Sequence, residues 1–173
     1  MNITYRKLQP HHAAAYRAIR LEALYLFPQN FGSTHENESA KLKLAFENYI
    51  ELQTPGKFIV GAFEGDTLIG ICGFVRDEGK KNIHRGSIIQ MYVKQQYNGK
   101  GIGLTLLNAT VKEAFALPGV EQLALGVITL NTPAVTIYNK AGFTPFAVHH
   151  NYFKEDDGSY LHQQYMILHK PVD

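Results

Sequence analysis

Residues 87–107 read SIIQMYVKQQYNGKGIGLTLL. This stretch is the most informative part of the sequence for the fold, and the other elements are expected to be arranged around it. Its first half, residues 88–93, is apolar and rich in β-branched side chains, which predicts a buried strand. A loop with Gly99, Gly101 and Gly103 follows and leads directly into helix-forming residues. Glycines let the backbone approach a ligand, and the first amides of a helix have no helical partner. With the helix dipole added, the pattern predicts a site for a phosphate or pyrophosphate.

Two common nucleotide motifs do not fit this glycine loop. A P-loop requires Gly-Lys-Ser/Thr, but Gly99 and Lys100 are followed by Gly101. A dinucleotide fingerprint that starts at Gly99 would need its third glycine where Leu104 stands. An ordinary glycine-rich turn between a strand and a helix is the structural alternative, and Lys100 among three glycines argues against it.

The loop instead resembles the acyl-coenzyme A loop of the GCN5-related N-acetyltransferase (GNAT) family, written Gln/Arg-x-x-Gly-x-Gly/Ala. Two registers are available. Residues 96–101, QYNGKG, match every letter, whereas residues 98–103, NGKGIG, have Asn98 in place of Gln or Arg. We choose the second register because Leu106 and Leu107 then fall where the helix of the family packs.

A second motif, NTPAVTIYNKAGF, covers residues 131–143. The family pattern for this segment is Asn-x-x-Ala-x-x-x-Tyr-x-x-x-Gly-Phe, and the chain matches it at Asn131, Ala134, Tyr138, Gly142 and Phe143. Ala134 and Tyr138 are four residues apart on an expected short helix, so they share one face. The small side chain leaves room for a ligand beside the phenol. The two motifs together are far more specific than either is alone.

Length and composition agree with one globular domain. A chain of 173 residues can build one sizeable core, and 45% hydrophobic and 18% charged residues are usual for a soluble protein. The net charge of +2 gives no reason to expect nucleic acid or a membrane as a partner. Cys72 is the single cysteine, and the first ten residues lack the apolar core of a signal peptide. We expect a single N-acetyltransferase domain over residues 1–173, located in the cytoplasm; a homodimer is compatible with the sequence.

The predicted order of elements also resembles that of the family. Besides the strand that ends at Val93, strands are expected at residues 3–8, 57–63, 67–76, 122–128, 144–153 and 160–168. Helices are expected at residues 11–27, 38–52, 101–115 and 132–141. The fold class is therefore α/β with a mixed (α+β) arrangement: a central mixed β-sheet flanked by helices, with one β–α–β crossover.

The resemblance implies direct transfer of an acetyl group from acetyl-coenzyme A, acting as cosubstrate, to a primary amine in a ternary complex. Tyr138 would be the general acid that protonates the departing thiolate, because a phenol stays protonated at neutral pH. A purely packing role for Tyr138, and a purely capping role for Asn131, are the alternatives. The implied cofactor-binding residues are Met91, Tyr92, Val93, Asn98, Gly99, Lys100, Gly101, Ile102, Gly103, Leu104, Asn131, Ala134 and Tyr138.

The general base is not evident in the sequence. No Asp or Glu lies between Glu78 and Glu113, so the strand glutamate of several family members is missing. Ser87 or Gln90 occupies that neighbourhood, and neither accepts a proton usefully at neutral pH. The amine would arrive neutral or lose its proton through water to a more distant group, for which the candidates are Glu22, Glu36, His84 and the histidines of the last hairpin.

The acceptor side is expected near the segment that follows the first helix. Residues 20–32 resemble an opening, Arg-Leu-x-Ala-Leu…Pro…Phe-Gly, that borders the acceptor pocket in relatives. Phe31 and Glu36 are therefore the candidate substrate-binding residues, with ordinary surface charge as the alternative for Glu36. No metal site is expected, because the adjacent His149 and His150 would point to opposite faces of a strand. A non-catalytic acyl-coenzyme A sensor domain is the alternative function.

Overall fold

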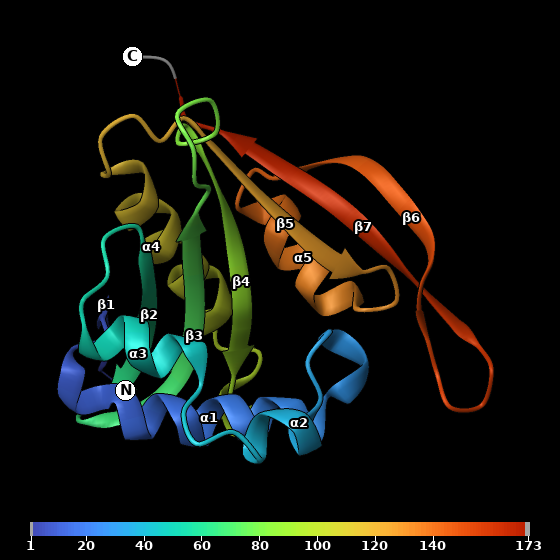
Figure 1. The fold of residues 1–173 in the computed structure, drawn as a ribbon, viewed down its shortest axis with the longest axis horizontal. Coiled ribbons are helices and arrows are strands. Elements are labelled where there is room, and N and C mark those ends of the chain that lie inside the picture. The colour runs from blue at the N-terminus through green and yellow to red at the C-terminus, as the bar shows by residue number, and fades with distance from the viewer. Residues whose placement is uncertain (1, 172–173) are drawn as a thin grey trace.

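The computed structural model describes residues 2–171 and contains one seven-stranded mixed sheet, with strands in the order β1-β2-β3-β4-β5-β7-β6 (Figure 1). The strands are β1 (Ile3–Lys7), β2 (Lys57–Glu64), β3 (Thr67–Arg76), β4 (Arg85–Val93), β5 (Gln122–Ile128), β6 (Thr144–Lys154) and β7 (Tyr160–His169). The helices are α1 (Ala13–Leu26), α2 (His35–Ser39), α3 (Ala45–Glu51), α4 (Ile102–Phe115) and α5 (Thr132–Lys140). Short 3₁₀ turns are η1 (Pro10–His12), η2 (Pro28–Asn30) and η3 (Gln95–Tyr97).

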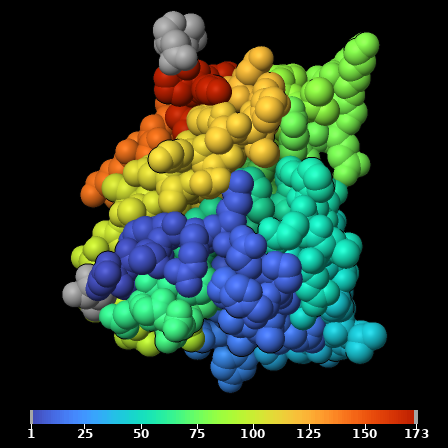
Figure 2. Space-filling model, turned by 90° about the vertical axis from the view of Figure 1, so that its left-hand side faces the viewer, coloured from blue at the N-terminus to red at the C-terminus, as the bar shows by residue number. Residues whose placement is uncertain are grey.

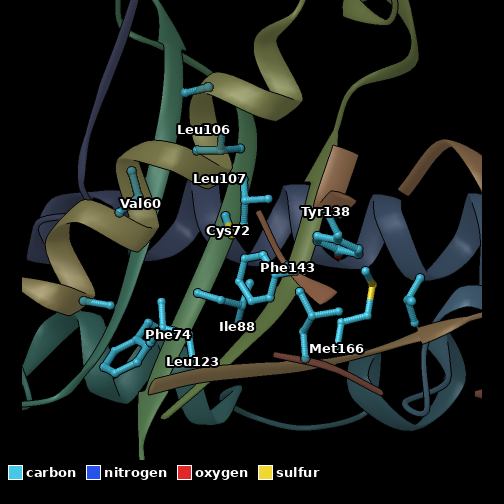
Figure 3. Close-up of a cluster of buried hydrophobic side chains, with 14 of the residues drawn as sticks. Val60, Cys72, Phe74, Ile88, Leu106, Leu107, Leu123, Tyr138, Phe143 and Met166 are labelled. Atoms are coloured by element: carbon cyan, nitrogen blue, oxygen red, sulfur yellow. The ribbon is translucent and has the colours of Figure 1, made fainter. Parts of the chain in front are cut away.

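The sheet separates two hydrophobic cores. Neighbouring residues of a strand point to opposite faces, so Val60 joins the core under α4 and α5 while Ile59 joins the core under α1 and α3. Figure 3 shows the first core, in which Cys72 and Leu107 are both fully buried. In Figure 2 the blue N-terminal segment lies between the yellow segment around residue 110 and the teal residues near 50. Both faces of the sheet are therefore covered at its β1–β4 end.

The parallel neighbours β4 and β5 separate after a short paired stretch. In the described part of the chain they pair only at Arg85 with Gln122, Gly86 with Leu123, and Ser87 with Ala124. Beyond Ser87 the two strands diverge (Figure 1). The expected crossover is confirmed, since α4 connects β4 to β5 and the pair is parallel.

Strand β4 also carries an irregularity near the middle of the sheet. Ile71 of β3 lies opposite Tyr92 and Gly73 lies opposite Ile89, so β4 has one more residue than β3 between these pairs. Gln90 lies in this bulge and has a φ of 53°, which is uncommon for a residue with a side chain. The bulge therefore changes the direction of the β4 backbone where the strand leaves β5.

The expected helix over residues 38–52 is wrong as a single element. The structure has two shorter helices, α2 and α3, separated by residues 40–44. Leu42, which fits the apolar side of the expected helix, is fully exposed, and Leu44 is extended with ψ 150°. The side chain of Glu47 accepts a hydrogen bond of 2.5 Å from the amide of Leu44, the N-cap residue of α3. This contact fixes the start of α3 at Ala45. Local capping thus prevails over the apolar spacing that suggests one long helix.

The other predicted elements agree with the structure within a few residues. The expected strand over residues 122–128 coincides with β5, and the expected helix over residues 11–27 begins with the turn η1 before α1. No helix within residues 2–171 is both long enough and apolar enough to cross a membrane.

Candidate active site

A cleft with a volume of about 600 Å³ opens where β4 and β5 diverge. One wall is β4 from Ile88 to Val93, and the other includes Gly126 and Val127 of β5 together with α5. The start of α4 lies at one end of the cleft, and Phe27, Asn30 and Phe31 contribute from the segment after α1. The cleft therefore joins both segments that carry the sequence motifs.

The wall formed by β4 has backbone groups available for a ligand. Within residues 2–171, β5 pairs with β4 no further than Ser87, so the β4 edge that lines the cleft has no strand beside it. Met91, Tyr92 and Val93, which the resemblance to the family places along a pantetheine arm, line the cleft on this edge. An extended chain could pair with such an edge as a further strand would. The bulge at Gln90 turns the local peptide groups, so it can present an amide to a carbonyl group.

The glycine loop leads directly into α4. Gly101 is the N-cap of α4, and both Gly99 and Gly101 have a φ of 75°, a conformation that favours glycine. A Cβ atom built on either glycine would meet no atom within 4 Å, so both face open space beside the cleft. The amide of Thr105 donates to Gly101 at 3.2 Å and closes the first turn of α4. The amides of the preceding residues, Ile102 to Leu104, lie in the helix start, which suits an anion.

The other residues of the loop differ in whether they line the cleft. A Cβ on Gly103 would come within 3.1 Å of Cδ1 of Ile137, so this glycine lets α4 approach α5. Asn98, Ile102 and Leu104 line the cleft. Lys100 does not line it; its ammonium donates to the carbonyl oxygen of Gln96 at 3.2 Å.

Tyr138 lies in α5 between the cleft and the buried core. Its side chain is 8% exposed, lines the cleft, and packs edge-on against Phe143 with 6.1 Å between the ring centroids. Figure 3 shows it beside the core cluster that contains Cys72 and Phe143. Burial, and then the nearby thiol of Cys72, raise the pKa of Tyr138 well above its ordinary value. The phenol is therefore protonated across the neutral range and can serve as a proton donor.

The helix that carries Tyr138 begins with a side-chain cap. Asn131 accepts a hydrogen bond of 3.3 Å from the amide of Ala134, which is typical of an N-cap residue. Asn131 and Ala134 also line the cleft. The cap therefore places the small side chain of Ala134 and the phenol of Tyr138 along the same wall.

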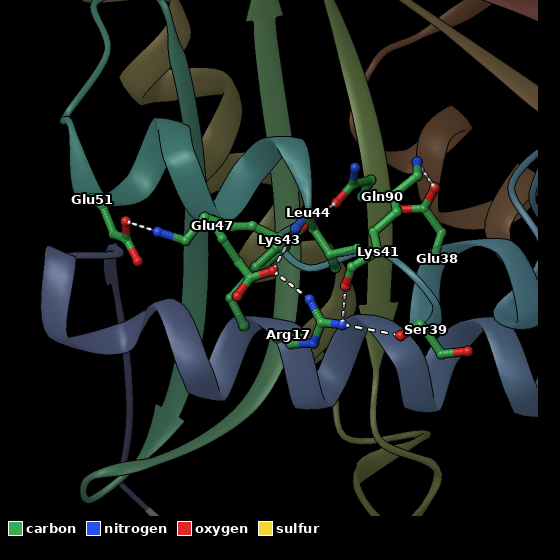
Figure 4. A network of polar contacts seen from close by, with 10 residues as sticks. Arg17, Glu38, Ser39, Lys41, Lys43, Leu44, Glu47, Glu51 and Gln90 are labelled. Carbon is green, nitrogen blue, oxygen red and sulfur yellow. Dashed lines mark hydrogen bonds and ion pairs between the residues drawn. The ribbon is translucent and has the colours of Figure 1, made fainter.

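The two candidate substrate-binding residues lie in different places. Phe31 lines the cleft, whereas Glu36 lies in α2 and is not among the lining residues. Tyr16 of α1 donates a hydrogen bond of 2.7 Å to Oε1 of Gln90, which also lines the cleft. Figure 4 shows the ion pair of Glu38 with Lys41, and it also labels Gln90. The end of the cleft near Phe31 is therefore bounded by α1, β4 and the segment after η2.

None of the candidate general bases lines the cleft. In the region that the structure describes, the lining contains no Asp, Glu or His. Glu22 is engaged on both carboxylate oxygens, by the hydroxyl of Tyr92 at 2.8 Å and by the ammonium of Lys94 at 2.7 Å. His84 precedes β4, at the end of the strand where β5 is still paired. Within residues 2–171, no three His, Cys, Asp or Glu side chains gather as a metal site requires.

Sequence reasoning missed several residues of the cleft. Asn30, Tyr97, Gly126 and Lys140 line it together with the predicted residues. Gly126 could have been found from the sequence, because an isolated glycine within a strand often marks a place where a ligand or another segment comes close to the backbone. A Cβ on Gly126 would come within 2.5 Å of Nε2 of Gln163, so the missing side chain makes room for that amide. Tyr97 and Lys140 carry no comparable signal.

A mixed sheet that opens between two parallel strands, with a glycine-capped helix at the opening, defines a protein of the acyl-coenzyme A N-acyltransferase fold. The sequence model of the acetyltransferase (GNAT) family matches residues 18–143. This chain belongs to that family, as its two motifs predicted.

Two curated relatives are similar to parts of the chain. An N-alpha-acetyltransferase from Sulfurisphaera tokodaii is 32% identical over 79 residues, which are 46% of this chain and 47% of that protein. A spermidine N(1)-acetyltransferase from Vibrio cholerae is 31% identical over 61 residues, or 35% of each protein. The chain thus spans about half the length, or less, of the curated relatives it matches.

Solved structures match the fold over nearly the whole chain. The protein yncA of Salmonella typhimurium, solved with its cofactor acetyl-CoA, has a TM-score of 0.81 at 20% identity. The match covers 100% of this chain and 96% of that one. An acetyltransferase of the GNAT family from Streptococcus pneumoniae has a TM-score of 0.80 at 22% identity and covers 98% of this chain and 100% of its own. The expected mixed-sheet fold flanked by helices is confirmed.

Proposed function

We propose that the protein transfers the acetyl group of acetyl-coenzyme A to a primary amine. The observation that carries this proposal is the continuity of one cleft, which runs from the glycine-capped start of α4, along the free edge of β4, to the buried phenol of Tyr138. The relatives named as N-alpha-acetyltransferase and spermidine N(1)-acetyltransferase support an amine as the acceptor class.

Different elements of the cleft would bind different parts of acetyl-coenzyme A. The amides at the start of α4, from Gly101 to Leu104, would hold the pyrophosphate of acetyl-coenzyme A. The backbone of Met91, Tyr92 and Val93 would pair with the pantetheine arm, in the position of a missing strand. An amide of the bulged segment would donate to the thioester oxygen and stabilise the charge that develops there.

Tyr138 would complete the reaction as the general acid. The amine nitrogen forms a bond to the thioester carbon, the carbon–sulfur bond breaks, and the sulfur takes the proton of the Tyr138 hydroxyl. The amine nitrogen gives up its proton to water, and the phenol is then reprotonated from solvent. The products are the N-acetylated amine and free coenzyme A. Because the pKa of Tyr138 is raised by burial, the proton is present on the oxygen before the thiolate leaves.

No side-chain base is required if the acceptor enters as the free amine. The cleft residues within the described chain include no carboxylate or imidazole that could take the proton. We therefore infer that the neutral fraction of the acceptor amine is the reactive species. The lack of a base in the cleft is also the observation that favours the second candidate, a non-catalytic acyl-coenzyme A sensor of the same fold.

Two measurements on the same preparation test the proposal. Acetyl-coenzyme A should raise the melting temperature, because a ligand that binds only the native state stabilises it. A panel of amines should then release free thiol at a rate that depends on the amine and on the protein. Thermal stabilisation without transfer to any amine would favour the sensor. Absence of any stabilisation at millimolar cofactor would contradict both functions.

A further inference from the structure

Arg20 of α1 is a buried cation without a full set of partners. Its side chain is 5% exposed, and its Nη1 atom has no hydrogen-bond partner within residues 2–171. A buried charged group that lacks partners destabilises a protein strongly. Arg17, three residues earlier on the same helix, shows the usual arrangement. Its guanidinium donates to Glu47 at 2.8 Å and to the carbonyl oxygens of Lys41 and Ser39 at 2.8 and 3.3 Å (Figure 4).

The guanidinium of Arg20 lies directly behind a wall of the cleft. Its Cζ atom is 4.7 Å from the centre of the Phe31 ring, and Phe31 lines the cleft near the end of α1. Phe31 follows the short turn η2, and its amide is held by one bond of 3.3 Å to Pro28. The cation of Arg20 therefore packs against the side chain of a residue that lines the cleft.

The nearby polar groups Tyr16 and Glu38 form their contacts with residues other than Arg20. Tyr16, one turn earlier on α1, directs its hydroxyl to Gln90. Burial lowers the pKa of Arg20, and the nearby Tyr16 and Glu38 act in the opposite direction. Glu38 forms its own ion pair of 2.5 Å with Lys41. Because Oε1 of Gln90 accepts from Tyr16, the Nε2 amide of Gln90 is its available donor. Arg20 and Gln90 thus offer hydrogen-bond donors, and the described lining offers no carboxylate.

We propose that Arg20 is a specificity-determining residue that binds a carboxylate of the acceptor, after Phe31 turns aside. This inference rests on the proposed acetyl transfer and narrows its acceptor to an amine that carries a carboxylate a few atoms away. The carboxylate can belong to a free amino acid or to the side chain of an acidic peptide N-terminus. A polyamine would place a second cation near Arg20 and is disfavoured by the same geometry.

Matched acceptors test this inference in the wild-type protein. The first pair is an amino acid and its amide; the second is a C-terminally amidated peptide that begins with Glu and the same peptide beginning with Gln. We expect kcat/KM for the carboxylate member of one pair to exceed that of the neutral member roughly 10- to 100-fold, the range for a hydrogen bond to a charged group. The pair that shows the preference identifies the source of the carboxylate.

Variants of Arg20 separate recognition from intrinsic amine reactivity. The two members of a pair differ in amine pKa, but this difference cancels when their kcat/KM ratio is compared between proteins. Arg20→Gln should reduce the ratio at least tenfold, and Arg20→Lys should retain part of it. Arg17→Gln, on the same helix and bound to Glu47, should lower stability and leave the ratio unchanged.

A second measurement does not depend on turnover or on the variants. With coenzyme A present, an N-acetylated amino acid should raise the melting temperature of the wild type more than its N-acetylated amide does. Equal ratios in wild type and Arg20→Gln, or a wild type that prefers neutral amines or polyamines, would overturn the inference while acetyl transfer stands. A wild type that acetylates no amine would overturn the proposed function itself and this inference with it.

Discussion

The hydroxyl of Tyr16 donates a hydrogen bond of 2.7 Å to Oε1 of Gln90, across 74 positions of sequence. This bond ties α1 to the residue of β4 that has a positive φ. The strained backbone of Gln90 lies between residues that pair with β3, and the hydrogen bond from Tyr16 holds its side chain. The bond therefore supports the bulge from the helix side of the sheet.

Tyr16→Phe removes this bond without changing the packing of the ring. We expect the free energy of unfolding to fall by about 1 kcal/mol, because the net contribution of one such hydrogen bond is of that order. Urea unfolding measures the change. Tyr97→Phe, which loses a bond to Glu64, is the comparison and should cost less, because Tyr97 is half-buried whereas Tyr16 is 1% exposed. A Tyr16→Phe protein of unchanged stability would show that the bond does not hold the bulge.

Tyr138→Phe tests the general acid. The ring and its contact with Phe143 persist, so the affinity for acetyl-coenzyme A should stay close to that of the wild type. Turnover should fall roughly a hundredfold or more, as is typical when a general acid is lost. Measuring kcat and cofactor affinity on the same preparation separates the two effects. Unchanged turnover would mean that Tyr138 only packs.

Gly101→Ala tests the anion site at the start of α4. The φ of 75° at Gly101 strains any side chain by about 1 kcal/mol or more, and the new methyl group would face the cleft. We expect the thermal stabilisation by acetyl-coenzyme A to decrease sharply. Gly65→Ala is the matched control, because Gly65 has a φ of 57° and the same open surroundings in the β2–β3 turn. A similar loss of cofactor response in both variants would assign the effect to general destabilisation.

The pH dependence of kcat/KM should follow the acceptor and not the protein. Since no carboxylate or imidazole lines the cleft within residues 2–171, kcat/KM should rise with pH until the amine of the acceptor is mostly neutral. Burial raises the pKa of Tyr138, so its acidic form persists and activity should not decline below about pH 10.

Two acceptors with different amine pKa values make this test decisive. The midpoint of the rising limb should shift with the acceptor. A midpoint near neutrality that is the same for both acceptors would reveal a base of the protein that the cleft does not show.

Glu47→Gln tests the contact network that begins α3. Glu47 is 7% exposed and accepts hydrogen bonds from both Arg17 and the amide of Leu44 (Figure 4). Removing its charge leaves the half-buried Arg17 without its ionic partner, and we expect a loss of about 2 kcal/mol in the free energy of unfolding. Glu51→Gln breaks the exposed pair with Lys43 and should cost less than 1 kcal/mol. Equal effects in urea unfolding would contradict this ranking.

The sequence predicted the parts of the fold that depend on local pattern. The apolar run of β4, the glycines and the Asn131–Tyr138 spacing lie within short segments, and the structure brings both segments to one cleft. The boundary between α2 and α3 was missed because Glu47 stabilises it through the amide of Leu44 and through Arg17.

The contacts at the end of the cleft near Phe31 could not be predicted for a related reason. Arg20 and Phe31 approach only after the chain turns at Pro28, and the link from Tyr16 to Gln90 spans α1 and β4. Such contacts depend on tertiary packing, and neither spacing nor composition encodes them directly. The resemblance to relatives drew attention to Phe31, which lines the cleft, but it did not predict the contact of Phe31 with a buried cation.

The divergence of β4 from β5 creates two sheet edges that face each other inside the protein. An exposed edge at the outside of a sheet invites pairing with other protein chains and leads to aggregation. Here residues of α5 and of the start of α4 line the gap between the two edges. Beyond Ser87, the β4 amide hydrogens that point away from β3 should therefore exchange readily with solvent in the free protein and become protected when the gap is filled.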